Sequence, residues 1–316
     1  MKTKYILGIG ICSILALASC ENVLDKTDLS AASPELITGD SILANVALSY
    51  IYEQNLPTWG GPTNVSALGG SAYSDESFYT GSSENKFIEG TIAEKDVTDF
   101  GTKLDATNNY GKIRTINSFI NDLTNDTKMN ADAKNRLLAQ AYFFRAWRYF
   151  ELVKLYGGVP LILTPQDAVA EQDRQAAFVS RNTTSECFQQ MMTDLDLSVK
   201  YLPGVWARPA ENWGRITKGA AAALKGRILL YAASPQFNPT DNQALWQAAY
   251  TANKQAYDIL AANGAKLFAD YGKLWFTEVG NTEAVFVTGY NASTSDQGKK
   301  NNGWEQSTRP KYATQS

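Results

Sequence analysis

Apolar residues recur every three or four positions along much of the chain, and polar or glycine-rich stretches separate these runs. This spacing is typical of amphipathic helices that bury one face. One short apolar run, residues 283–287, predicts a strand instead. The pattern therefore indicates a mainly α fold, with predicted helices at residues 34–54, 105–123, 130–156, 182–202, 217–233 and 242–262.

Several of these helices have recognisable ends. Ser33 and Pro34 suit a helix start, since serine caps free N–H groups and proline fits the first turn. Gly157 and Gly158 end the third helix, and Pro160 prevents it from resuming.

The third helix is apolar on two faces, so it must be covered on both sides. We therefore expect stacked helix pairs, with Phe143, Trp147 and Tyr149 in the core rather than at a binding site. Arg145 and Arg148, with Glu151, are expected to form structural ion pairs or to join helices.

Alanine and glycine dominate the helix at residues 217–233, which lets a neighbouring helix approach closely. Large aromatic residues alternate with small ones across the helix pairs. This alternation is typical of tetratricopeptide repeats, although a strict repeat period is not clean here.

The N-terminus predicts export and lipidation. Lys2 and Lys4 precede an apolar run that ends in Leu17-Ala18-Ser19-Cys20. A short basic region followed by a short apolar run is a secretory signal. Small residues before a cysteine suit a lipoprotein signal peptidase, so residues 1–19 are expected to be removed and Cys20 lipidated. The alternative is an ordinary signal peptide with a chance cysteine.

Composition removes several classes of chemistry. The chain has no histidine, which excludes Ser-His-Asp triads, Cys-His dyads and histidine zinc sites. Its formal charge is −3. Without Lys2 and Lys4 the count becomes 27 basic against 32 acidic residues, which argues against a nucleic-acid partner. Cys187 would be the one thiol besides the lipidated cysteine, and its amphipathic helical setting predicts a buried, inert group.

Three stretches resemble the SusD/RagB family of outer-membrane lipoproteins. One is residues 139–162, which contains Leu155-Tyr156-Gly157-Gly158-Val159-Pro160-Leu161. The second runs from Gly214-Arg215-Ile216-Thr217-Lys218-Gly219 into Lys225-Gly226-Arg227-Ile228-Leu229-Leu230-Tyr231. The third is the cysteine signal with Leu24-Asp25 shortly after it.

The resemblance implies tetratricopeptide-like helix pairs packed with an irregular, loop-rich part. Residues 20–33 would be a tether, and residues 34–316 a SusD-like domain shortened at its C-terminal end. The implied function is capture of oligosaccharides at the cell surface, for delivery to a SusC-type TonB-dependent transporter in the outer membrane. Peptide binding of the RagB type and a tetratricopeptide scaffold without sugar binding remain alternatives.

Aromatic side chains on loops are the candidate ligand contacts, because sugar rings need flat apolar faces and polar partners. The long loop at residues 55–99 is rich in both, and Ser74-Asp75-Glu76 is similar to the family's Asp-Glu element before its ligand loop. The alternative for each aromatic is packing of the loop onto the helices. The predicted ligand-binding residues are Trp59, Tyr73, Asp75, Tyr79, Asn85, Phe87, Tyr290 and Trp304.

A surface glycosidase is the main rival, since two carboxylates suffice for it. Asp194 and Asp196 are close in sequence, but residues two apart on a helix point away from each other. Asp75 and Glu76 lack an evident second acid. We therefore expect no catalytic residue. No cofactor or metal is expected from the residues, because no acidic loop has calcium spacing, and the resemblance alone leaves calcium open.

Overall fold

The computed structural model describes residues 39–56, 90–91, 93, 109–166, 174–175 and 177–289. Within these ranges the chain forms seven helices and no strand, which confirms the mainly α prediction. The helices are α3 (Ser41–Asn55), α4 (Asn109–Asn125), α5 (Ala131–Tyr156), α7 (Thr184–Tyr201), α8 (Lys218–Ala233), α9 (Gln243–Ala262) and the single turn α10 (Tyr271–Leu274).

The helix ends confirm the local capping signals. The Asn130 side chain accepts hydrogen bonds from the Asp132 and Ala133 N–H groups at 3.0 and 3.2 Å and caps α5. Gly157 then ends α5 with φ of 69°, a conformation that glycine adopts at little cost. Thr183 and Glu186 form a reciprocal capping box at the start of α7.

Two sequence predictions were wrong. The first helix begins at Ser41 rather than Pro34, because Gly39 has φ of 85° and Asp40 is extended. Asp40 accepts from the Ile42 N–H at 2.7 Å and so caps the helix itself. Residues 283–287 form turns and loop rather than a strand, since no neighbouring strand is present among the described residues to pair with them.

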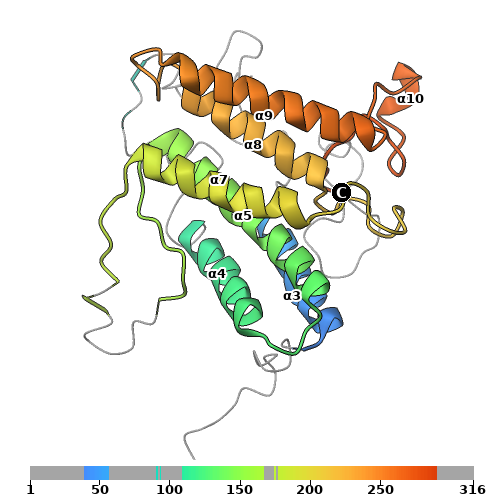
Figure 1. Ribbon diagram of the computed structural model, residues 1–316, viewed down its shortest axis with the longest axis horizontal. Coiled ribbons are helices and arrows are strands. Elements are labelled where there is room, and N and C mark those ends of the chain that lie inside the picture. Colours follow the sequence, from blue (N-terminus) through green and yellow to red (C-terminus); the bar gives the residue numbers. More distant parts are fainter. Residues whose placement is uncertain are drawn as a thin grey trace, which may run out of the picture.

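The described helices stack so that each packs on the next (Figure 1). α3 and α4 both contact α5, which packs against α7; α7 contacts α8, and α8 contacts α9. α5 is therefore covered on both sides, and Phe143 and Tyr149 are almost fully buried, as the two apolar faces predicted. This succession of antiparallel neighbours is the tetratricopeptide-like arrangement.

Small residues allow α8 and α9 to approach closely. A Cβ atom placed on Gly219 would lie 2.4 Å from the Leu260 side chain. One placed on Gly226 would lie 2.5 Å from the Asn253 amide, which also donates to the Gly226 carbonyl at 3.0 Å. The predicted close contact along residues 217–233 is thus confirmed.

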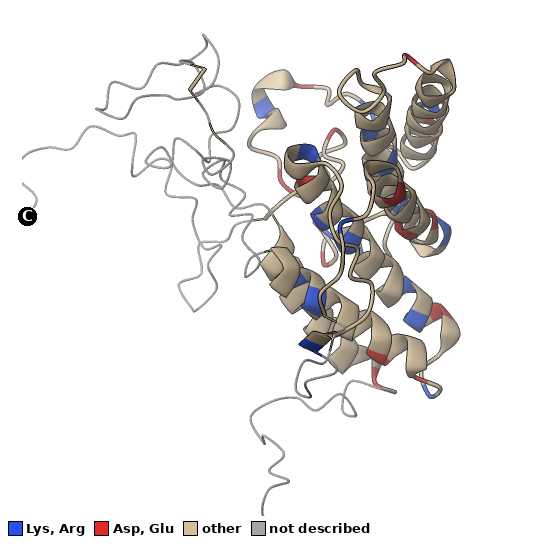
Figure 2. Ribbon diagram, turned by 90° about the vertical axis from the view of Figure 1, so that its left-hand side faces the viewer, with Lys and Arg blue, Asp and Glu red and all other residues tan. Residues whose placement is uncertain are grey.

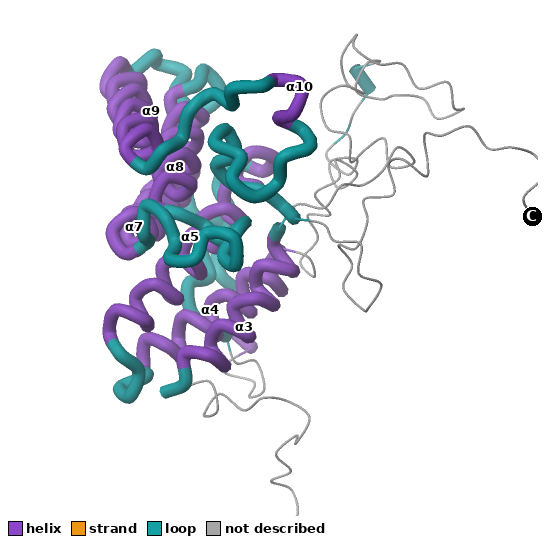
Figure 3. Tube along the Cα trace, turned by 90° about the vertical axis from the view of Figure 1, so that its right-hand side faces the viewer, coloured by secondary structure: helices purple, strands orange, loops and turns teal. Residues whose placement is uncertain are grey.

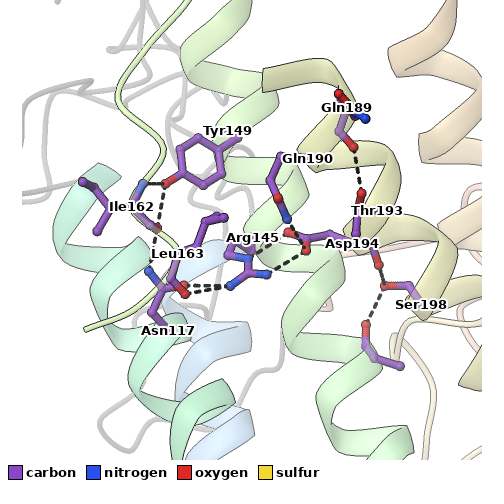
Figure 4. Close-up of polar contacts among 11 residues, drawn as sticks. Asn117, Arg145, Tyr149, Ile162, Leu163, Gln189, Gln190, Thr193, Asp194 and Ser198 are labelled. Atoms are coloured by element: carbon purple, nitrogen blue, oxygen red, sulfur yellow. Dashed lines mark hydrogen bonds and ion pairs between the residues drawn. The ribbon is translucent and has the colours of Figure 1, made fainter. Parts of the chain in front are cut away.

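A buried polar network joins α4, α5 and α7 (Figure 4). The Arg145 guanidinium donates to both carboxylate oxygens of Asp194, at 2.8 and 2.7 Å. Its remaining nitrogen donates to Asn117 and to the Leu163 carbonyl. Asp196, two residues along, points outward to Lys225. The predicted structural role of Arg145 and the divergence of the two aspartates are both confirmed.

Arg148 joins two helices, as predicted. Its guanidinium donates to the Asn55 side chain at 2.7 Å and to the carbonyls of Gln54 and Asn55, at the end of α3. Glu151 forms an ion pair with Lys154 at 2.9 Å within α5. These contacts align α3 with α5 and leave no role in ligand binding for the charged side chains of this helix.

Basic and acidic residues are interspersed along the described helices (Figure 2). Such a mixture does not form the basic surface that nucleic acid requires. Among the same residues, no helix is long and apolar enough to span a bilayer.

Candidate functional site

The loops that follow α7 and α9 lie on the same side of the helical stack and face the viewer in Figure 3. In the described part of the chain they enclose a cleft with a volume of about 280 Å³. Three segments, far apart in sequence, form its walls. These segments are residues 204–217, residues 260–265 and residues 280–287.

The first wall is a loop closed on itself by backbone and side-chain contacts. The Lys218 N–H donates to the Pro203 carbonyl at 2.9 Å, so the two ends of the loop meet. The Trp206 indole donates to the Ile216 carbonyl at 3.0 Å, and the Ile216 N–H donates to the Tyr52 hydroxyl at 2.9 Å. These contacts attach the loop to the helical core and define the position of its second tryptophan, Trp213.

Tyr52 links the cleft to the core. Its hydroxyl donates to the Gln140 amide oxygen at 2.7 Å while accepting from Ile216. Burial raises the pKa of the Tyr52 phenol well above its usual range, against the opposite effect of the Ile216 N–H. The phenol therefore stays neutral and keeps its donor at physiological pH.

The third wall rests on aromatic packing. The ring of Phe286 lies 5.4 Å from the ring of Phe143 and 6.0 Å from that of Trp147, both on α5. Phe286 thereby connects the cleft to the core of the helical stack. The Lys266 N–H donates to the Thr282 carbonyl at 3.1 Å and joins the second wall to the third.

The chemistry of the cleft suits binding of a neutral polar ligand. Its lining contains three asparagines, two threonines and two tryptophans, and Arg215 is its one charged side chain. Trp213 is half-buried, so its ring is accessible from the cleft. No carboxylate lines this described cleft, so it lacks the acid and base pair of a glycosidase. Aromatic faces beside amides and hydroxyls are what a carbohydrate site requires.

The predicted ligand-binding residues Trp59, Tyr73, Asp75, Tyr79, Asn85, Phe87, Tyr290 and Trp304 lie outside the described residues, as does Cys20. They stay predictions. The cleft residues Trp206 and Trp213 were not among them, although the same signal, an aromatic on a turn-rich loop, points to both. Phe286 was missed because its run was assigned to a strand.

The described residues include no group of three or more His, Cys, Asp or Glu side chains that could bind a metal ion. Cys187 is fully buried and its thiol lies 3.5 Å from the Val159 carbonyl. Burial raises the pKa of this thiol, which keeps it protonated and unreactive, as predicted.

Comparison with known proteins identifies related sequences. A SusD-like family model, described as starch-binding and associating with the outer membrane, matches residues 23–230. The chain is 31% identical over 96 residues to SusD-like protein P2 of Formosa agariphila, a match that covers 30% of this chain and 18% of that protein.

Solved structures share the fold. A SusD homologue from Bacteroides thetaiotaomicron aligns with a TM-score of 0.66 and 21% identity, over 86% of this chain and 50% of that one. A laminarin-binding SusD-like protein aligns with a TM-score of 0.57 and 24% identity, over 79% and 51%. A SusD-like carbohydrate-binding protein from Bacteroides fragilis aligns with a TM-score of 0.60 and 22% identity, over 78% and 46%. The chain thus spans about half the length of these solved relatives.

Proposed function

This chain belongs to the SusD-like family of starch-binding proteins that associate with the outer membrane, and on that basis we propose that it binds oligosaccharides at the cell surface. The observation that carries the proposal is a cleft of aromatic, amide and hydroxyl groups on a chain of this family. The proposed ligand is a neutral glycan, because Arg215 is the one charged side chain of the described cleft.

The proposed binding mode follows from the geometry of the first wall. Trp213 offers a flat face to the C–H groups of a sugar ring, and the attachment of its loop to Tyr52 keeps that face in position. Asn212, Asn281 and Thr282 supply donors and acceptors for hydroxyl groups. A site positioned before the ligand arrives loses less conformational entropy on binding.

Binding without hydrolysis is part of the proposal. The described cleft contains no pair of carboxylates to act as acid and base. Incubation of the purified protein with a bound glycan should therefore leave the chain length of the glycan unchanged. Release of shorter products that disappears in the Asp75→Ala variant would instead revive the glycosidase reading.

We further propose that Cys20 is lipidated, that the protein is anchored in the outer membrane and faces outward, and that it passes its ligand to a SusC-type TonB-dependent transporter. The apolar signal before Cys20 and the family's association with the outer membrane support this proposal. In the native organism, Cys20→Ser should release the protein from the outer-membrane fraction. The lipidated protein should co-purify with a barrel protein from detergent extracts.

Glycan binding is tested with the full chain, purified in detergent, against laminarin, starch and a panel of soluble polysaccharides. We expect Trp213→Ala to weaken the affinity for a bound glycan about tenfold, which corresponds to about 1.4 kcal/mol. Tyr250→Ala is the matched control, because Tyr250 is exposed on α9 and does not line the cleft. Equal affinities for the two variants would remove the cleft from the proposal, and binding of peptides alone would favour the RagB-like alternative.

A further inference from the structure

Exposed aromatic side chains gather on the segment that leads into the third wall of the cleft. Tyr271, Trp275 and Phe276 are 77%, 76% and 88% exposed. We call residues 270–277, which contain all three, the aromatic turn. Large aromatic side chains grouped at the surface mark an interaction site, because single exposed apolar residues are common but clusters are not.

Polar contacts stabilise the aromatic turn, so burial of its aromatic rings is not required to shape it. The Asp270 side chain accepts from the Lys273 N–H at 3.3 Å and caps the single turn α10. The Thr277 hydroxyl donates to the Lys273 carbonyl at 3.0 Å. The Asn281 amide donates to the carbonyls of Leu274 and Thr277, at 3.0 and 3.2 Å. The rings are thus presented on an ordered backbone.

Two of the rings share one side of the turn. Tyr271 begins α10, and Trp275 follows it by four residues with a right-handed helical backbone. Side chains four residues apart on a helical turn are neighbours on its surface. Tyr271 and Trp275 therefore lie next to each other and form an apolar surface longer than a single ring.

Asn281 joins the aromatic turn to the cleft. The same side chain that bonds the Leu274 and Thr277 carbonyls lines the cleft. Its oxygen also accepts from the Glu283 N–H at 3.0 Å, in the third wall. A ligand that leaves the cleft past Asn281 consequently meets the aromatic turn next.

We propose that the aromatic turn is a second contact surface for the same oligosaccharide, and this inference rests on the proposed function. Sugar rings stack their C–H faces on the electron-rich faces of aromatic rings. Lys273 and Glu278 are exposed beside the rings and can bond hydroxyl groups. A bound peptide needs a groove or a sheet edge, and this projecting turn offers neither among the described residues.

The inference predicts a dependence on ligand length. Short oligosaccharides should contact the cleft alone, whereas long ones should reach both the cleft and the aromatic turn. Affinities are measured by calorimetry, with the full chain in detergent, for a series of oligosaccharides cut from the polysaccharide that binds best. Trp275→Ala should weaken binding of the longest members about tenfold and leave the shortest unchanged. Trp213→Ala should weaken binding of all lengths.

The controls separate this inference from the proposed function. Tyr257→Ala removes an equally exposed ring from α9, away from the turn, and should have no effect at any length. Phe276→Ala provides a second test, because its ring is 88% exposed and its loss should not alter the unfolding midpoint. If Trp275→Ala and Phe276→Ala both match Tyr257→Ala while Trp213→Ala still weakens binding, the aromatic turn is not a glycan surface and the cleft stands. If the two turn variants instead abolish co-purification of another polypeptide and leave glycan affinity intact, the turn is a protein contact and the inference is overturned.

Discussion

The buried ion pair between α5 and α7 allows a quantitative test of what stabilises the helical stack. The Arg145 and Asp194 side chains are 7% and 1% exposed and meet through two hydrogen bonds of 2.8 and 2.7 Å. Asp194 also accepts from the Gln190 amide at 3.0 Å, so its carboxylate is well satisfied. Burial raises the pKa of the Asp194 carboxyl, and the Arg145 guanidinium opposes that change. Removing one charge leaves the other buried without a partner.

Asp194→Asn should lower the free energy of unfolding by about 3–5 kcal/mol, because the neutral amide leaves the Arg145 charge uncompensated in the interior. A domain of this kind has a total stability of about 5–15 kcal/mol, so the variant should remain folded but markedly weakened. Asp196→Asn is the matched control on the same helix. Its ion pair with Lys225 has a partner carboxylate that is 60% exposed, and its loss should cost about 0–1 kcal/mol.

Urea unfolding followed by far-ultraviolet circular dichroism at neutral pH measures both variants. The double variant Arg145→Met with Asp194→Leu should recover most of the loss, since apolar residues of similar volume often replace a buried pair at little cost. If Asp194→Asn and Asp196→Asn differ by less than about 1 kcal/mol, the pair is not as isolated from water as its burial indicates.

Two further predictions concern side chains that attach loops to helices. The N–H groups of Lys128 and Gly39 lower the pKa of the Asp126 carboxyl, so its stabilising effect is present above the ordinary carboxyl range and is lost as pH falls through the lowered value. The melting temperature of Asp126→Asn should therefore approach that of the unmodified chain on acidification, and a difference independent of pH would contradict this. The Tyr149 hydroxyl donates to the Ile162 carbonyl at 2.8 Å and accepts from its N–H at 2.7 Å, so Tyr149→Phe should cost about 1–3 kcal/mol in urea unfolding. A change within about 0.5 kcal/mol, as for a surface position, would show that water replaces the hydroxyl.

The binding site illustrates how far residue type alone can lead. A search for aromatic residues on loops is sound chemistry, and it identified the long loop at residues 55–99. The same rule applies to Trp213, but nothing local shows that its loop lies beside residues 260–265 and 280–287. That adjacency depends on α8 and α9 packing closely and returning the chain to the end of α7.

The sequence by itself determined the helices and most of their ends, because helical periodicity and capping depend on residues a few positions apart. Asn130, Thr183 and Gly157 act within one turn of their own backbone and could be recognised directly. It also determined the close contact at Gly219 and Gly226, since small residues at helical spacing leave room for a neighbour whatever that neighbour is.

Only the tertiary structure decided which distant groups meet. Arg145 and Asp194 are 49 residues apart, and the sequence could predict an ion pair for Arg145 without naming its partner. The start of α3 at Ser41 and the loop at residues 283–287 likewise depend on competition between local preference and available partners. The cleft belongs to this second class, because three segments acquire a common site only after the helices between them have packed.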